Sequence, residues 1–234
     1  MHRCIAVLWQ TGRVPKVADP AVRAALIEQA ARITAEEGRD ALTLRRLAKE
    51  VGASTMAVYT HFGGMDDLRR EVRREGFARL LAHIDEVDDT DDPVADLFAL
   101  GAAYYRNGTT NPNLYRAMFM DGPVDDQDCT VGLDTFAHLV RAVGRCMAAG
   151  RLDQADPDHL ATQLWVVQHG VVALHLATML PPGQALAALH SAGSNLLLAF
   201  GDSPAALARS ARGAAARPTP QAPGPVHEAV TDRG

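Results

Sequence analysis

The sequence has few cysteines, and their spacing gives them no structural role. Among 234 residues there are three, Cys4, Cys129 and Cys146, which are far apart and form no CxxC pair. An odd number of scattered cysteines argues against a disulfide framework, and a zinc site needs more closely spaced ligands. We therefore expect no bound metal and no cofactor, and the reducing cytoplasm as the location.

Long hydrophobic runs are also missing. No stretch approaches the roughly 20 apolar residues that span a bilayer. The opening MHRCIAVLWQTG contains an apolar run that is too short for the hydrophobic region of a signal peptide. We therefore expect no membrane association. Since 47% of the residues are hydrophobic, the chain can form the core of one large or two small globular domains.

Motifs of the common enzyme classes are absent as well. The chain contains no G-x-S-x-G, HExxH, P-loop or dinucleotide-binding pattern. His169 and His175 are six residues apart, which on a helix places them about 120° from alignment and disfavours a shared metal. We predict that the protein is not an enzyme. A helical binding module that has lost DNA binding remains an alternative.

Positive charge is scarce overall and is unevenly distributed. The net charge is −5, yet residues 20–80 contain 11 Lys and Arg against 9 Asp and Glu, whereas residues 81–200 contain 5 against 15. A polyanion is attracted to the first segment and repelled by the second. If the protein binds DNA, it should do so through its N-terminal part.

A helix-turn-helix pattern lies in this more basic part. The segment Thr43 to Phe62, TLRRLAKEVGASTMAVYTHF, predicts two short helices joined by a glycine turn. The first has an apolar face with i, i+3, i+4 and i+7 spacing, formed by Leu44, Leu47, Ala48 and Val51. Thr43 and Ser54 suit the two N-caps, and Gly52 suits the turn. The second helix leaves small, hydroxylic and aromatic side chains outside, a surface that fits a major groove.

The sequence resembles the TetR family of transcriptional regulators from Leu42 to Leu68, LTLRRLAKEVGASTMAVYTHFGGMDDL. The resemblance implies an all-α fold, in which a three-helix DNA-binding domain precedes a larger helical bundle that dimerises. An ordinary helical hairpin would need the apolar spacing but would have no use for exposed Tyr59, Thr60 and His61. Where the family often has Lys at the start of the next helix, this chain has Met65, so one usual phosphate contact is missing. Arg69 or Arg70 could compensate for it.

We predict that DNA is contacted by Thr43, Arg45, Thr55, Met56, Ala57, Tyr59, Thr60 and His61. Arg45 is the candidate for reading guanine, since a guanidinium can bond O6 and N7 together. A surface position or a phosphate contact is nearly as compatible with its place in the sequence. The start of the second helix offers a hydroxyl and two apolar groups suited to thymine methyls, and Thr60 is expected to join them. Tyr59, His61 and Thr43 match family positions that hold phosphates.

The domain organisation follows from composition and periodicity. We expect a flexible arm over 1–19, the DNA-binding domain over 20–64, a ligand-binding and dimerisation domain over 65–201 whose linking helix is 65–86, and a disordered tail over 202–234. The other expected helices are Ala21–Glu37, Pro93–Arg106 ended by Asn107-Gly108, Asn111–Met120, Cys129–Ala149, Pro157–Met179 and Pro182–Phe200.

The second domain resembles the TetR ligand-binding group named for a Trp-His-Gly signature. LWVVQHGVVALHL places Trp165, His169 and Gly170 in matching positions. The predicted ligand contacts are Tyr105, Tyr115, Met118, Phe119, Phe136, Trp165, Gln168, His169 and Val172. Tyr104, Met120 and Met147 belong to the same wider set of candidates. Most such aromatic and methionine residues form core, and only interleaved polar groups favour a pocket.

Together these features predict a bacterial one-component regulator, most simply a repressor. The last two long helices are apolar on more than one side, so we expect a homodimer in which they form a four-helix interface. Two-fold symmetry then predicts a palindromic double-stranded DNA operator. The effector is expected to be a small apolar or amphipathic molecule that releases the operator.

Overall fold

The computed structural model describes residues 19–119, 122, 125 and 130–217, and within these ranges all the regular secondary structure is helical. The helices are α1 (Pro20–Glu37), a 3-10 turn (Arg39–Ala41), α2 (Leu44–Val51), α3 (Thr55–Phe62), α4 (Met65–Asp85), α5 (Pro93–Thr110), α6 (Pro112–Phe119), α7 (Leu133–Ala148), α8 (Pro157–Leu176), α9 (Pro182–Ala199) and α10 (Pro204–Ala215). Residues 1–18 of the predicted arm over 1–19, which include Cys4, lie outside the described residues, as do Met120 and Cys129.

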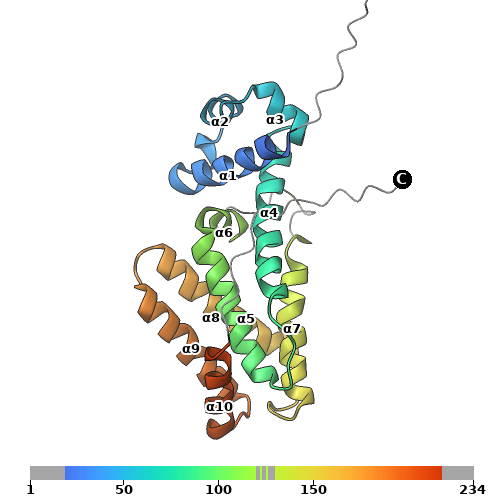
Figure 1. Ribbon diagram of the computed structural model, residues 1–234, viewed down its shortest axis with the longest axis vertical. Coiled ribbons are helices and arrows are strands. Elements are labelled where there is room, and N and C mark those ends of the chain that lie inside the picture. Colours follow the sequence, from blue (N-terminus) through green and yellow to red (C-terminus); the bar gives the residue numbers. More distant parts are fainter. Residues whose placement is uncertain (1–18, 120–121, 123–124, 126–129, 218–234) are drawn as a thin grey trace, which may run out of the picture.

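The molecule is elongated, with α1–α3 at one end and α5 and α7–α10 at the other (Figure 1). The long helix α4 runs from the first group into the second, as expected of a linking helix. Its Leu68 and Val72 pack into the core of α1–α3, whereas its Phe77, Leu80 and Ile84 pack against α5 and α8. A rotation or shift of α4 therefore affects both ends of the molecule. None of the described helices combines the length and apolar character needed to cross a membrane.

Helix α5 is longer than predicted. Asn107 and Gly108 do not end it, and the helix continues to Thr110. A Cβ atom on Gly108 would lie 2.5 Å from Cγ1 of Val172 in α8, so glycine allows the two helices to approach closely. The Asn107 side chain is buried and accepts a hydrogen bond from Asn111 Nδ2 at 3.1 Å. The Asn-Gly pair thus serves packing between helices, which local sequence signals do not reveal.

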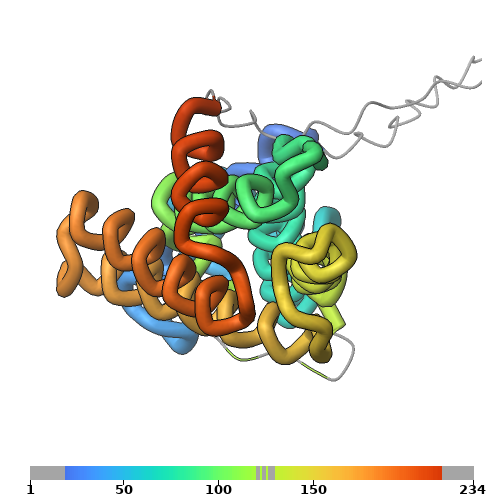
Figure 2. The backbone as a smooth tube through the Cα atoms, turned by 90° about the horizontal axis from the view of Figure 1, so that it is seen from below, coloured from blue at the N-terminus to red at the C-terminus, as the bar shows by residue number. Residues whose placement is uncertain are grey.

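The segment after Gly201 also differs from the prediction. A disordered tail was expected from residue 202, but Pro204–Ala215 forms α10, which lies across the lower end of the bundle (Figure 2). Buried Ser210 donates a hydrogen bond to Asp92 at 2.9 Å, and Arg151 makes two hydrogen bonds with buried Asp202. These long-range contacts hold the Ala-rich segment against the rest of the bundle. Residues 218–234 lie outside the described residues.

A charged cluster fixes the start of α5 against α7 and the end of α10. Asp96 is 1% exposed and accepts hydrogen bonds from Arg145, Arg217 and the backbone and hydroxyl of Thr90. Burial alone would raise the pKa of Asp96, but these donors outweigh it and lower the pKa. The carboxylate therefore stays charged and joins three elements of the lower domain.

Candidate DNA-reading surface and ligand cavity

Capping groups build the helix-turn-helix as the sequence predicted. The Thr43 hydroxyl oxygen accepts a hydrogen bond from the backbone N–H of Arg46. The Ser54 hydroxyl oxygen accepts one from the backbone N–H of Ala57. Gly52 has φ +72°, in the left-handed region, and ends α2. As an N-cap, Thr43 uses an oxygen lone pair, so its hydroxyl proton stays available to a phosphate.

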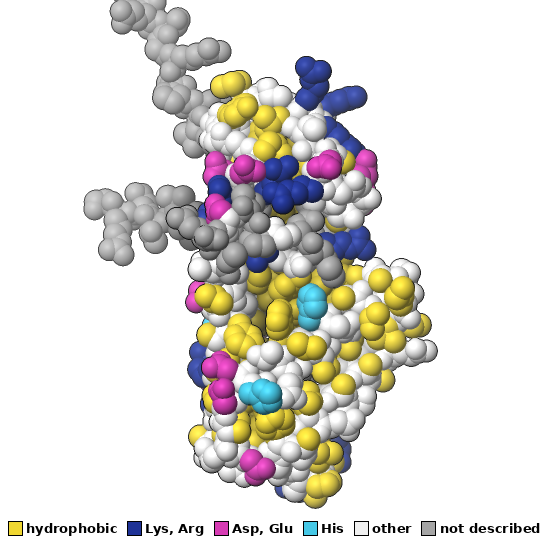
Figure 3. Space-filling view, turned by 180° about the vertical axis from the view of Figure 1, so that it is seen from behind, with side chains coloured by type: hydrophobic (Ala, Val, Ile, Leu, Met, Phe, Trp, Pro, Cys, Tyr) yellow, Lys and Arg dark blue, Asp and Glu magenta, His cyan; other side chains and the backbone are white. Residues whose placement is uncertain are grey.

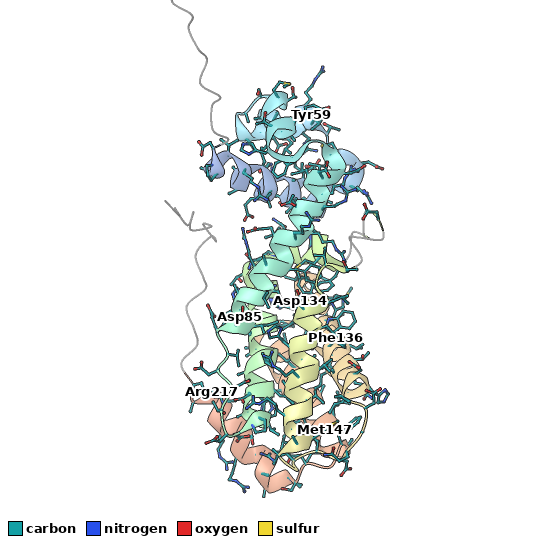
Figure 4. All side chains as sticks on the ribbon, turned by 90° about the vertical axis from the view of Figure 1, so that its right-hand side faces the viewer. Tyr59, Asp85, Asp134, Phe136, Met147 and Arg217 are labelled. Atoms are coloured by element: carbon teal, nitrogen blue, oxygen red, sulfur yellow. The ribbon has the colours of Figure 1, made fainter. Side chains whose placement is uncertain are left out.

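Helix α3 presents an exposed surface at the outer end of the molecule. Val58 and Phe62 are buried, while Met56 and Tyr59 are 66% and 48% exposed. Tyr59 lies at the end of the molecule opposite Met147 and Arg217 (Figure 4). Large apolar side chains left exposed on one helix indicate an interaction surface.

The remaining predicted contacts of α3 differ in how freely they can reach DNA. Thr55 is exposed, whereas Ala57 and His61 are half-buried. The hydroxyl of Thr60 donates its hydrogen to the Met56 carbonyl at 2.8 Å, so its methyl group and oxygen lone pairs are what it offers a base. The structure thus brings Thr55, Met56, Tyr59 and Thr60 to one outer surface, with His61 closer to the core.

Two neighbouring arginines of α2 have different surroundings. Arg46 forms ion pairs with Glu37 and Glu50, which lower the pKa of both carboxyls. Arg45 is exposed and pairs with no acid among the described residues. Because Glu37 and Glu50 already balance the charge of Arg46, Arg45 is the arginine of α2 that remains available to DNA.

The structure does not favour the suggested replacement for the missing lysine. Met65 is partly buried and packs against the core of α1–α3. Arg69 pairs with Asp66 at 2.8 Å, and Arg70 pairs with Asp67 and Asp125. A phosphate would have to compete with these carboxylates for either guanidinium. The start of α4 therefore has little unpaired positive charge to offer a phosphate.

Replacing Arg45 with Ala should cost about 1–3 kcal/mol of binding at one base pair and relax selectivity there. Tyr59→Phe should instead weaken all sequences about equally if the hydroxyl holds a phosphate. Arg212→Ala, which removes the same charge from an exposed position on α10, is the matched control for Arg45→Ala. Binding measured on a panel of single-base operator variants separates the two effects, and a uniform loss for Arg45→Ala would exclude base reading.

A cavity of about 350 Å³ lies inside the second domain, between α4, α5, α7 and α8. Its walls are mainly apolar, and its polar groups come from a few side chains. The lining residues are Arg73, Phe77, Leu80, Ile84, Leu100, Tyr104, Phe119, Val131, Gly132, Leu133, Thr135, Phe136, His138, Leu139, Thr162, Trp165 and Gln168. Apolar walls with few polar groups are typical of small-molecule sites.

Four of the predicted ligand contacts line this cavity: Phe119, Phe136, Trp165 and Gln168. The other five do not. Met118 and Val172 are buried core residues, Tyr105 packs against His175, and Tyr115 and His169 lie behind the wall. Phe136 lies on α7 near the middle of the molecule (Figure 4). The ligand role of all nine remains a prediction.

The sequence missed the contribution of α4 to the wall. The predicted ligand contacts include no residue of the linking helix, although Phe77, Leu80 and Ile84 on the apolar side of α4 face the cavity. The breadth of that side was the available signal, since a helix that covers a hollow needs more apolar surface than one that only links domains. Thr135 and Leu139 of α7 carried no distinguishing signal.

A hydrogen-bonded group of three side chains supports the wall behind the cavity. The Tyr115 hydroxyl lies 2.7 Å from His169 Nδ1, and the Tyr104 hydroxyl lies 3.3 Å from each of these two atoms. Burial lowers the pKa of His169 and raises that of Tyr104 to about 12. All three groups are therefore neutral at pH 7, so they add polarity without charge. Among the described residues, no cluster of His, Cys, Asp or Glu could hold a metal ion.

Family models match both parts of the chain. Residues 26–72 match the model "Bacterial regulatory proteins, tetR family", and residues 97–193 match "Tetracyclin repressor-like, C-terminal domain". The chain belongs to the TetR family. It is a transcriptional regulator with a DNA-binding helix-turn-helix, and such regulators are typically not enzymes.

Relatives and solved structures agree with this TetR-family assignment. An HTH-type transcriptional regulator of Mycobacterium tuberculosis is 29% identical over 170 residues, which is 70% of this chain and 75% of the relative. A protein of unknown function from Rhodococcus sp. RHA1 has a TM-score of 0.68 at 24% identity and covers 81% of this chain and all of its own. The TetR-family regulator PfmR from Thermus thermophilus has a TM-score of 0.63 at 18% identity, with coverages of 76% and 99%. At these identities the structural likeness shows the fold.

Proposed function

We propose that this TetR-family protein is a repressor that binds a palindromic operator as a homodimer and releases it when a small apolar or amphipathic molecule fills the cavity between α4 and α8. It would act on DNA in the bacterial cytoplasm. The observation that carries the proposal is that the cavity wall and the core of the DNA-binding domain share α4 and α6. Movement of the wall is thereby transmitted to the reading surface.

Helix α6 supports this coupling because its two faces lie in different cores. Leu114 and Ala117 pack with α1 in the DNA-binding domain, whereas Tyr115 and Met118 pack in the second domain. Phe119, its last residue, lines the cavity. A ligand that displaces Phe119 therefore pushes on an element that touches α1 directly. Packed elements of this kind switch between discrete arrangements more readily than they deform.

Arg116 ties the same two domains together by hydrogen bonds. Its guanidinium donates to the Ala35 carbonyl at the end of α1 at 3.2 Å and to the Leu176 carbonyl at the end of α8 at 3.3 Å. Arg116→Ala should lower the free energy of unfolding by about 1–2 kcal/mol, because two carbonyls lose a charged donor. Hydrogen exchange should quicken at the ends of both α1 and α8 together. Faster hydrogen exchange at the end of α1 or of α8 alone would contradict the idea that Arg116 holds both helices. So would the same faster exchange in the control Arg141→Ala, at an exposed position of α7.

Exposed apolar side chains on α8 and α9 support the dimer. Val166 and Leu174 on α8 and Leu186 on α9 are 58%, 47% and 49% exposed, and Met179 between the helices is 74% exposed. Apolar side chains gather over the domain below the DNA-binding end, including the side of α8 and α9, while Lys and Arg concentrate near the DNA-binding end (Figure 3). A second copy packed against α8 and α9 would cover this surface and present two reading heads.

The Trp-His-Gly likeness adds to the ligand proposal. Trp165 lines the cavity, and His169 stands one helical turn further along α8 with its ring 5.8 Å from that of Trp165. RolR, determined in complex with resorcinol, has a TM-score of 0.54 at 18% identity and covers 87% of this chain. A small aromatic diol in that protein is consistent with a neutral aromatic effector here.

A gel shift on the DNA upstream of the protein's own coding sequence tests the proposal. We expect a specific shift that is lost with unlabelled competitor of the same sequence and reversed by an effector. Because coupling between two sites is reciprocal, operator DNA must weaken effector binding by the same factor by which effector weakens DNA binding. Absence of any specific shift would favour the alternative of a helical binding module without DNA binding, for which Met65 is the motivating feature.

A further inference from the structure

A second cavity of about 270 Å³ lies on the other side of α8, between α5, α9 and α10. Its walls are also mainly apolar, with Leu97, Phe98, Leu164, Val167, Leu189 and Leu197 among its lining residues. His190 lines it too and stacks on Phe98 with ring centroids 5.0 Å apart. Helix α10 borders this cavity with Ala211, Ala214 and Ala215. Small side chains on α10 leave the space open.

Gln168 lines both cavities and is the residue common to them. It is 7% exposed, and no described residue gives its side-chain amide a hydrogen bond. The amide nitrogen and oxygen are not fully buried, so they can be reached from the cavities and can bond a polar group there. On the facing helix stands Gly101, and a Cβ atom placed there would already lie 3.5 Å from Gln168 Nε2. That distance is an ordinary van der Waals contact, so Gln168 packs against α5 at the boundary between the two cavities.

Charge in the two cavities limits the kind of molecule that fits. No acidic side chain is among the described residues that line either one. In the first cavity Arg73 donates to the Met118 carbonyl at 2.6 Å, and His138 Nδ1 bonds the Asp134 carbonyl at 2.7 Å. These basic groups thus have partners within the protein. Moving a charged ligand from water into a cavity with apolar walls costs free energy that the walls do not offset.

We propose that the effector is a neutral, elongated, mostly apolar molecule whose hydroxyl or carbonyl group is bound by the Gln168 amide. One arm, best an aromatic ring, lies in the first cavity beside Tyr104, Phe136 and Trp165, and an apolar arm extends past Gln168 into the second. The amide offers a donor and an acceptor, so it can bind either kind of polar group. This inference rests on the proposed function, since it names the chemical class that acts at the same site.

Alkyl phenyl ketones are suitable probes because they combine a ring, a carbonyl and an alkyl arm. Calorimetric titration should show that hexanophenone binds at least about tenfold more tightly than acetophenone, since the longer chain buries more apolar surface. Gln168→Leu should weaken hexanophenone binding about five- to tenfold. Gln163→Leu, on the same helix but outside both cavities, should not change it. Ala214→Phe, which narrows the second cavity, should remove the advantage of the longer chain while leaving acetophenone unchanged.

Several results would overturn the inference: equal affinities for the two ketones, equal effects of Gln168→Leu and Gln163→Leu, or tighter binding of charged 4-hexylbenzoate than of hexanophenone. Because Ala214→Phe leaves the bundle between α4 and α8 intact, it tests the second cavity even where Gln168 variants are unstable. The proposed function is assessed separately by gel shift. Gln168-dependent binding of hexanophenone without operator release would refute the regulatory function and support the inference. Operator binding without ketone binding would support DNA binding as proposed and refute the inference.

Discussion

Leu174→Glu is expected to leave the protein monomeric and to weaken operator binding about 100-fold or more, because one reading head then binds without the other. Leu174 is 47% exposed on α8, between exposed Val166 and Met179. In a two-fold interface the substitution places two like charges in an apolar contact, and neither has a partner. Sedimentation velocity gives the mass, and fluorescence anisotropy on an operator duplex gives the affinity.

The control for this prediction is Ala208→Glu, which adds the same charge to an exposed apolar position on α10. It should leave both the mass and the DNA affinity unchanged. A dimer that persists in Leu174→Glu would show that α8 does not form the interface. A monomer that retains full operator affinity would show that the two-headed mode of binding is wrong.

Asp96→Asn is expected to lower the free energy of unfolding by about 2–4 kcal/mol at pH 7. The amide keeps the shape of the carboxylate but cannot balance Arg145 and Arg217, which lie 2.8 Å and 2.7 Å from it. Both arginines are partly exposed, so water relieves some of the cost. Denaturant unfolding of the variant measures the loss, and Asp91→Asn in the exposed loop before α5 should show almost none.

The stability provided by Asp96 should depend on pH in one direction. Its pKa is lower in the folded than in the unfolded chain, so the unfolded chain takes up protons first as the pH falls. The contribution is complete at neutral pH, begins to decrease near the ordinary aspartate pKa of 3.8 and disappears below the lowered pKa of the folded state. The wild type and Asp96→Asn should therefore approach each other in stability only below about pH 4. If the difference in stability between the two proteins stayed the same below about pH 4, the charge of Asp96 would not be what stabilises the contact.

The DNA-binding domain was predictable because its signals are local. Thr43, Gly52 and Ser54 act within four residues of their own positions, and the apolar face of α2 needs only one partner surface. The end of helix α5 could not be predicted in the same way, because Gly108 serves close packing against Val172 on another helix. Nor could α10, which is held by Asp92, far away in the sequence.

Prediction of the ligand contacts was limited by the ambiguity of apolar helices. Tyr115 and Phe119 lie one turn apart in α6, yet the first is fully buried and the second lines the cavity. Sequence spacing places both on nearby faces and does not reveal where the hollow is. Gln168 was predicted because polar groups interleaved with apolar residues favour a pocket, but its position between two cavities follows only from the packing of α5, α9 and α10.

Selection of bound duplexes from random double-stranded DNA tests most directly that α3 and Arg45 form the reading surface of a dimer. The account predicts a palindrome whose half-sites lie about one helical turn apart, and it predicts that Arg45→Ala loses preference at one symmetric base-pair position while Arg212→Ala does not. Recovery of no preferred sequence, or of a site without two-fold symmetry, would contradict it.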